Sequence, residues 1–223
     1  KILDKYCDIV LVGDSLGNVL YGMENTHSVT KEMMINHAIS VKKGLNKALC
    51  VVDMPKNTYN SPNEAKKNAQ QIIQRSKCEA VKIESNKKNY NIIKHLVRSK
   101  INVAGHIGFT PQHSSKFKVK GKSILEEKKL IKEAIKIEEA GAFCVILECI
   151  SAETSKKITE LLKIPTIGIG SSKNCDGQIL VTDDIIGLSG FYPKFIRKYL
   201  DISKIIDKGI KKYSKDVLKK KFP

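Results

Sequence analysis

The stretch IVLVGDSLGNVLYG, Ile9–Gly22, decides how the rest of the chain is interpreted. It opens with a nearly unbroken apolar run, which is typical of a strand buried on both faces of a parallel sheet. The run ends on Asp14 and Ser15, which lie between glycines. Two interpretations are open for this ending: a polar turn that only closes the strand, or a site at the strand's carboxyl end with Asp14 directed at a ligand.

Six more apolar runs follow, and the segments between them space their apolar residues as helices do. Strands are therefore expected at 8–14, 48–55, 80–85, 101–108, 142–149, 164–170 and 178–184. Helices are expected at 28–45, 61–76 and 124–141, with capping signals at Thr30, at Ser61 with Glu64, and at Gly141.

Strands that alternate with helices predict an α/β fold. A (β/α)8 TIM barrel is favoured over a doubly wound sheet, because polar side chains recur at the strands' carboxyl ends and a barrel brings those ends together on one face. No linker or repeat interrupts the series, so we expect a single domain over 1–223. The polar strand ends are Asp14 with Ser15, Asp53, Lys82 with Glu84, His106, Glu148 and Ser171.

The composition restricts the partners of the chain. Its formal net charge is +17 over 223 residues, but the lysines are spread along the sequence, aromatic residues make up 6%, and Trp is absent. Because a nucleic-acid-binding surface gathers basic and aromatic residues, we expect no nucleic-acid partner. We also expect no membrane partner, since no apolar run approaches the ~20 residues of a membrane span.

The six cysteines show no CxxC pair and no metal-ligand spacing. Several lie in apolar runs, such as Cys50 and Cys144, and we expect free, buried thiols in a reducing compartment. The opening residues, Lys1–Lys5, lack the basic-then-apolar pattern of a signal peptide. Both features favour a cytoplasmic location.

Three carboxylates follow three successive predicted strands: Asp14, Asp53 and Glu84. Gathered at one end of a sheet, they would repel one another unless a cation lay between them. Oxygen ligands of this kind suit Mg²⁺ or another hard divalent ion. The alternative is that each carboxylate caps the helix that follows it.

Lys82 and Glu84 are two residues apart and therefore point to the same face of a strand. A Lys directed into a barrel is rare unless it is paired or functional, so Lys82 is expected to bind a substrate carboxylate or to stabilise an enolate oxygen. A salt bridge with Glu84 is the alternative, and the two roles can coexist. His106 joins the same ring of strand ends. Glu148 ends a very apolar run, a setting that suits a general base for a carbon acid, although a pair with a lysine is also open.

The ordered motifs resemble one family, ketopantoate (3-methyl-2-oxobutanoate) hydroxymethyltransferase. They are LVGDSLGNVLYG, VVDMP, AVKIES, GHIGFTPQ, EEAGAFCVILECI, ITELLKIPTIGIG and CDGQILV, followed by PKFIRKY and the final FP. The resemblance implies a (β/α)8 barrel of the phosphoenolpyruvate/pyruvate superfamily that forms large homo-oligomeric rings. It implies transfer of a one-carbon unit from 5,10-methylenetetrahydrofolate to 3-methyl-2-oxobutanoate, which gives 2-dehydropantoate for pantothenate and coenzyme A biosynthesis.

The resemblance also implies roles for individual residues. Glu148 matches the family's proton acceptor. Mg²⁺ would be held by Asp14 and Asp53, with Glu84 in the same metal site. The implied contacts to the 2-oxo acid come from Asp14, Ser15, Asp53, Lys82 and His106.

The chain departs from the family pattern at several places. The family's first strand, which ends in a Tyr-Asp pair, has no counterpart here, so we expect Ile9–Gly22 to open with the barrel's second strand. The loop 113–122 is altered, Lys56 stands where the family has an apolar residue, Ser171 and Ser172 replace Ala-Gly, and Asp183 replaces a His. These changes affect the expected folate contacts more than the enolisation chemistry.

Two alternative functions are open. One is a Mg²⁺-dependent lyase or mutase of the same superfamily that acts on another 2-oxo acid; such enzymes usually carry a reactive Cys in a mobile loop, and no cysteine here lies in such a motif. The other is a degraded, non-catalytic barrel. Exchange of the C3 proton of 3-methyl-2-oxobutanoate, with Mg²⁺ present, tests the enolisation mechanism.

Overall fold

A parallel sheet of seven strands organises Lys1–Gln178, the first of two compact units. The computed structural model describes residues 1–85, 89–114, 117–190 and 195–223. The strands are β1 (Ile9–Val12), β2 (Leu49–Asp53), β3 (Ala80–Glu84), β4 (Asn102–Gly108), β5 (Cys144–Glu148), β6 (Thr166–Ile169) and β7 (Gly177–Gln178). They pair in chain order, each parallel to the next.

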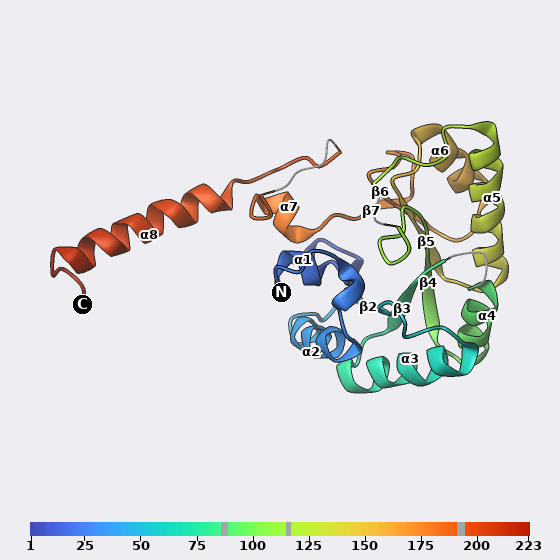
Figure 1. The fold of residues 1–223 in the computed structure, drawn as a ribbon, viewed down its shortest axis with the longest axis horizontal. Coiled ribbons are helices and arrows are strands. Elements are labelled where there is room, and N and C mark those ends of the chain that lie inside the picture. Colours follow the sequence, from blue (N-terminus) through green and yellow to red (C-terminus); the bar gives the residue numbers. More distant parts are fainter. Residues whose placement is uncertain (86–88, 115–116, 191–194) are drawn as a thin grey trace. The chain divides into compact units, whose positions relative to one another are not determined.

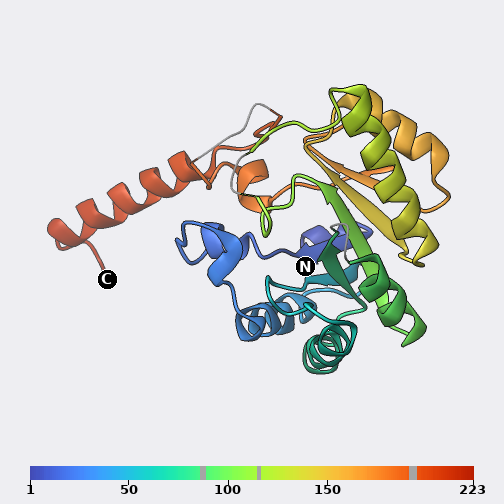
Figure 2. The same cartoon turned by 45° about the vertical axis from the view of Figure 1, so that its right-hand side comes forward.

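Helices connect the strands and lie along the outer side of the curved sheet (Figure 1). Figure 2 shows the same arrangement from a second direction, with the helices outside the strands. The helical segments of this unit are η1 (Leu3–Lys5), α1 (Leu16–Val19), η2 (Thr26–Ser28), α2 (Lys31–Lys42), α3 (Pro62–Ser76), α4 (Tyr90–Arg98), α5 (Ile124–Glu139) and α6 (Ala152–Leu161).

The sheet is an open half-barrel in the part of the chain that the structure describes, because β1 pairs with β2 alone and β7 with β6 alone. The predicted α/β class and parallel strand arrangement are confirmed. The closed eight-stranded barrel, the place of β1 as its second strand, and the single domain stay predictions.

The first six predicted strands are confirmed with slightly shorter bounds, but the seventh, 178–184, is wrong for most of its length. Only Gly177–Gln178 pairs with the sheet, and Thr182–Ile186 forms the short helix α7. Asp183 and Asp184 lie in the first turn of α7, where carboxylates favour a helix N-terminus. Gly187 then ends the helix with φ +81°. The apolar run alone did not reveal these helix signals.

The predicted capping signals fix where the longer helices begin and end. Thr30 Oγ1 accepts the Met33 N–H at 3.2 Å at the start of α2, and Ser61 Oγ accepts the Glu64 N–H at 3.3 Å at the start of α3. Gly141, with φ +90°, follows the end of α5. Each cap satisfies backbone groups that a helix end leaves without partners.

The core lies between the sheet and its covering helices. Each large apolar side chain buried there contributes roughly 1.5–3 kcal/mol relative to exposure to water. The largest fully buried ones include Met34, Ile35, Ile72, Ile83, Ile93, Leu96, Ile107, Ile137, Leu147 and Ile158. This packing holds the strands in position, and the polar residues lie at the ends of those strands.

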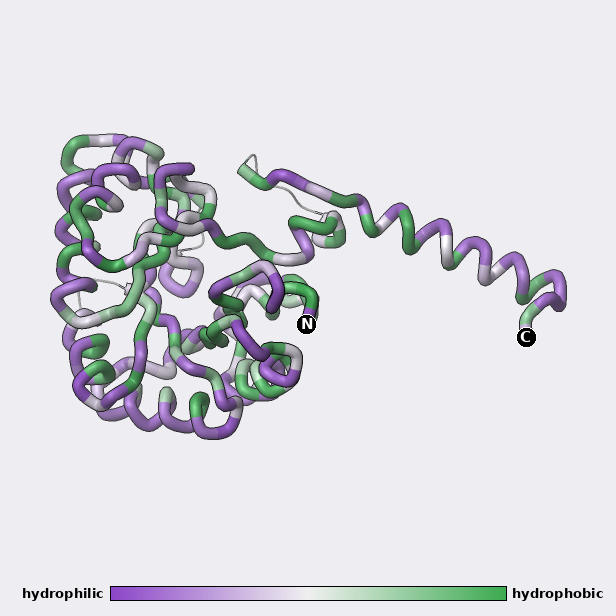
Figure 3. The backbone as a smooth tube through the Cα atoms, turned by 180° about the vertical axis from the view of Figure 1, so that it is seen from behind, coloured by the Kyte–Doolittle hydropathy of each residue, from purple (hydrophilic) through white to green (hydrophobic). Residues whose placement is uncertain are grey.

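The second unit, Ile179–Pro223, contains α7 and the long helix α8 (Ile202–Leu218). Apolar and hydrophilic residues alternate along the turns of α8 (Figure 3), as in a helix with one apolar face. The first two residues of the PKFIRKY motif, 193–194, lie outside the described residues, as do residues 115–116 of the altered loop. Among the described helices, none has the length and apolar character needed to cross a bilayer.

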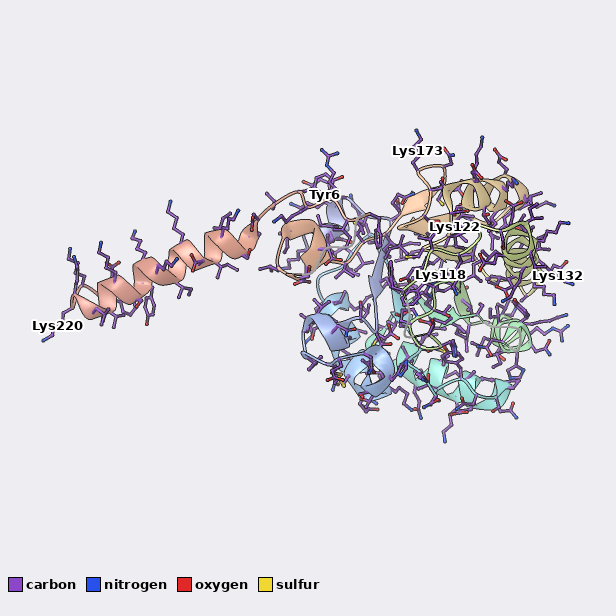
Figure 4. All side chains as sticks on the ribbon, turned by 45° about the horizontal axis from the view of Figure 1, so that its top comes forward. Tyr6, Lys118, Lys122, Lys132, Lys173 and Lys220 are labelled. Atoms are coloured by element: carbon purple, nitrogen blue, oxygen red, sulfur yellow. The ribbon has the colours of Figure 1, made fainter. Side chains whose placement is uncertain are left out.

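The cysteines and lysines behave largely as expected. All six cysteines are free thiols, and five of them are buried. Lys132, on α5, and Lys173 are exposed and point away from the sheet (Figure 4).

A Gly105→Ala substitution is expected to destabilise the first unit by about 1–3 kcal/mol, because it overpacks a filled core. A Cβ at this β4 position would lie 2.5 Å from Ile137 Cγ2 on α5. Urea denaturation measures the loss. As the control, Gly209→Ala on α8 meets no atom within 4 Å and is expected to stabilise its helix by about 0.5–1 kcal/mol. Equal stabilities of wild type and Gly105→Ala would contradict this account of the β4–α5 contact.

Candidate active site

Polar side chains gather at the carboxyl ends of β1 to β5, as the sequence predicted. The strand register makes Asp53 the neighbour of Lys82, and Glu84 the neighbour of His106. The residues brought together are Asp14, Asp53, Lys82, Glu84, His106 and Glu148; all are buried except Glu148, which is half-buried.

Asp53 is the centre of the first group of contacts. Its Oδ2 accepts the backbone N–H of Asp14 at 2.9 Å, and its Oδ1 lies 2.9 Å from Lys82 Nζ. The salt bridge weighed for Lys82 with Glu84 is therefore wrong: the partner is Asp53, which faces Lys82 directly across the β2–β3 pair. One carboxylate thus joins the ends of three strands.

His106 extends this network from Lys82 to Glu148. Its Nδ1 lies 3.3 Å from Lys82 Nζ and its Nε2 lies 3.1 Å from Glu148 Oε2. Burial, and next the charge of Lys82, lower the pKa of His106. The contacts therefore assign a neutral imidazole, with Nδ1 facing the ammonium and a protonated Nε2 facing the carboxylate. His106, and not the lysine that had been an alternative, is the partner of Glu148.

Gln112 is a site residue that the sequence reasoning missed. Its Nε2 donates to Asp14 Oδ2 at 2.8 Å and to the Met54 carbonyl at 3.0 Å, and its backbone N–H donates to Glu84 Oε2 at 3.0 Å. Tyr59 donates its hydroxyl proton to the Gln112 side-chain carbonyl. The only sequence signal was its place in the motif GHIGFTPQ, just beyond a strand end.

The electrostatics of the site follow from burying several carboxylates around one ammonium. Burial, and next the charge of Asp53, raise the pKa of Asp14 to about 7. Burial raises the pKa of Glu84 to about 9. For Lys82, burial acts to lower the pKa, but the surrounding carboxylates, Asp53 foremost, outweigh it and hold the pKa above its usual value. Fully ionised, these four groups would carry two more negative charges than positive ones.

This donor set suits a divalent cation. The carboxylate oxygens of Asp14 and Asp53 are hard ligands, and a divalent charge would balance the excess of negative charge. Gly13 keeps the space beside them open, since a Cβ there would lie 3.1 Å from Ser15 Oγ and 3.6 Å from Asp53 Oδ2. Within the described ranges, no group of three or more His, Cys, Asp or Glu side chains is arranged as a ligand set, so Asp14, Asp53 and Glu84 stay predicted metal ligands.

Ser15 lies at the start of α1, directly after Asp14, and is half-buried. Its side chain forms no cap hydrogen bond with the helix, which leaves its hydroxyl available to the space beside Gly13. Its contact with a 2-oxo acid stays a prediction, as do the substrate contacts expected of the other site residues.

The model of the family named ketopantoate hydroxymethyltransferase matches residues 1–223. The chain belongs to this family. Among similar proteins, the 3-methyl-2-oxobutanoate hydroxymethyltransferase of Pelagibacter ubique is 50% identical over 223 residues, which cover 100% of this chain and 87% of that protein. The enzyme of the same name from Anaplasma marginale is 45% identical over 226 residues, covering 100% of this chain and 82% of that protein.

Solved structures add the fold. A 2,3-dimethylmalate lyase, described as a member of the PEP mutase/isocitrate lyase superfamily, aligns with a TM-score of 0.57 at 15% identity, over 74% of this chain and 59% of that one. An oxaloacetate acetylhydrolase aligns with a TM-score of 0.54 at 12% identity, over 72% and 58%. The ketopantoate hydroxymethyltransferase family resemblance inferred from the motifs is thus confirmed, and the superfamily likeness is one of fold.

The lowered pKa of His106 predicts a pH dependence of stability. The unfolded chain protonates this His near pH 6.5, and the folded chain only at lower pH. Its contribution to the free energy of unfolding is therefore complete above about pH 6.5 and is lost as the pH falls below it, by at most about 1.4 kcal/mol per pH unit. A His106→Asn variant is expected to show a shallower slope between pH 7 and 5 in urea denaturation. Parallel slopes for the two proteins would contradict a neutral His106.

Proposed function

We propose that this chain transfers a hydroxymethyl group from 5,10-methylenetetrahydrofolate to 3-methyl-2-oxobutanoate and so forms 2-dehydropantoate for pantothenate biosynthesis. Family membership and the names of its relatives support this function. The observation that carries it is the fixed chain of contacts from Asp53 through Lys82 and His106 to Glu148. These contacts bring a positive charge and a half-buried carboxylate to one end of the sheet, as enolate formation requires.

Glu148 is the base in this proposal. Its carboxylate takes the proton from C3 of the 2-oxo acid, while the Nε2–H of His106 holds the other side of the group and keeps it in one orientation. Lys82 places its ammonium where negative charge develops on the enolate oxygen. The enolate carbon then bonds to the methylene carbon of the folate, and water supplies the hydroxyl oxygen as tetrahydrofolate leaves.

The cation that suits the site is Mg²⁺ or another hard divalent ion, held by Asp14 and Asp53 with Glu84 beside them. When bound, it supplies Lewis-acid polarisation of the keto group. Gln112 orients two of the carboxylates for this task by donating to Asp14 and to Glu84. Ser15 is placed for a further contact with the 2-oxo acid.

The same proposal extends to the architecture and setting of the enzyme. The half-barrel belongs to a (β/α)8 barrel, one domain over 1–223, that works as a homo-oligomer in the cytoplasm. The solved structures with TM-scores of 0.54 and 0.57 support the barrel class through their fold.

Glu148→Gln is expected to bind 3-methyl-2-oxobutanoate but to lose exchange of its C3 proton for deuterium by roughly 10²–10⁴-fold, because the amide is no base. Proton NMR in deuterated buffer with Mg²⁺ measures the exchange. Glu160→Gln, on the exposed side of α6, serves as the matched control and is expected to exchange at the wild-type rate. An active Glu148→Gln would remove Glu148 as the base. If the wild type exchanges the proton but transfers no one-carbon unit from the folate, the lyase or mutase alternative is favoured. If the wild type shows no exchange, the non-catalytic barrel is favoured.

Asp14→Ala and Asp53→Ala are expected to abolish the Mg²⁺ dependence of 3-methyl-2-oxobutanoate binding, since each removes one of the two oxygen ligands. Isothermal titration of the 2-oxo acid with and without Mg²⁺ measures this. Thermal melting without the metal identifies any variant that has simply unfolded. Mg²⁺-dependent binding that persists unchanged in both folded variants would rule out this ligand pair.

A further inference from the structure

Two basic side chains from different loops contact each other beside the site, and a third lies near them. His27 is on η2, Lys56 follows β2, and His113 follows β4. Lys56 Nζ lies 3.3 Å from His27 Nδ1, and His27 Nε2 lies 3.1 Å from the carbonyl oxygen of Pro111. We name these three side chains the basic cluster. It adjoins the active site, since Pro111 directly precedes Gln112.

Backbone contacts hold two members of the basic cluster in place. The side chain of Asn25 accepts the His27 N–H at 2.9 Å, which anchors His27 at the start of its short helix. Lys56 lies in a tight turn closed by the Thr58 N–H on the Pro55 carbonyl at 3.2 Å. Because the Pro111 carbonyl requires a proton on His27 Nε2, His27 Nδ1 accepts from the Lys56 ammonium.

The basic cluster has no matching negative charge. No carboxylate pairs with Lys56 in the described part of the chain, whereas lysines such as Lys157 and Lys42 pair with Glu127 and Glu79. Burial lowers the pKa of His113, and next the charge of Lys56 lowers it further. A half-buried ammonium next to imidazoles, without a counter-charge, is an electrostatic environment that attracts an anion.

We propose that Lys56, His27 and His113 form an anion-binding subsite that takes a carboxylate of the glutamate tail of the folate co-substrate. The assignment rests on the proposed function. The folate's methylene carbon must reach the 2-oxo acid beside Glu148, and its glutamate carboxylates lie at the other end of the molecule. The basic cluster stands on the loops around the site, where that tail would leave it.

The subsite predicts a preference among folates. A folate tail with several glutamates offers several carboxylates to the basic cluster. The charge of Lys56 therefore affects the affinity for such a folate more than the affinity for a folate with one glutamate. The triglutamate form is therefore expected to bind more tightly than the monoglutamate form.

Isothermal titration with 5-formyltetrahydrofolate, a stable folate, in its monoglutamate and triglutamate forms tests this. Lys56→Met keeps the length of the side chain and removes its charge, and is expected to raise the Kd of the triglutamate form about tenfold, as loss of a charge-assisted hydrogen bond does. His113→Gln is expected to raise it by a smaller factor. The matched control is Lys67→Met, an exposed lysine on α3, which is expected to leave both Kd values unchanged.

Mg²⁺-dependent exchange of the C3 proton of 3-methyl-2-oxobutanoate should stay at the wild-type rate in Lys56→Met, which shows that the variant is folded and its carboxylate site intact. An unchanged triglutamate Kd in Lys56→Met would overturn the subsite, as would the absence of folate binding by the wild type. If Lys56→Met instead weakened the affinity for 3-methyl-2-oxobutanoate, that result would also overturn the folate subsite. Transfer activity is measured separately, so failure of the proposed function and failure of the subsite give different results.

Discussion

The ion pair between Asp53 and Lys82 is the interaction on which the rest of the site depends. Both groups are buried, and removal of one partner from such a pair costs about 3–5 kcal/mol because the other charge is left without compensation. Lys82 also contacts His106, and Asp53 also accepts the backbone N–H of Asp14. A single pair of opposite charges therefore determines the positions of groups from four strand ends.

The strand register brings these side chains into contact. Asp53 and Lys82 are direct neighbours on β2 and β3, and Glu84 and His106 are direct neighbours on β3 and β4. On one side of Lys82 lie the carboxylates of Asp53 and Asp14, and on the other side His106 leads to Glu148. The two halves of the proposed chemistry, charge stabilisation and proton removal, thus share one buried ammonium.

Much of the fold and of the site could be predicted from the sequence, because the information was local. Continuous apolar runs gave the strands, Ser61 with Glu64 marked a helix start, and polar strand ends marked the site. Contacts between distant residues were not available in the same way. Gln112 joins Asp14 and Glu84 through a loop whose path follows from tertiary packing. Lys82 pairs with Asp53 rather than Glu84 because Asp53 lies directly opposite it on the neighbouring strand, and the two-residue period of a single strand does not show such cross-strand neighbours.

The neutral state of His106 limits where a proton can travel. Its Nε2 already carries the hydrogen that faces Glu148, and a second proton on Nδ1 would place a cation against Lys82 in a buried pocket. His106 therefore does not conduct protons inward from Glu148. A proton bound by Glu148 therefore has to leave on the solvent-exposed side of the carboxylate, because the side that faces His106 offers no acceptor for it.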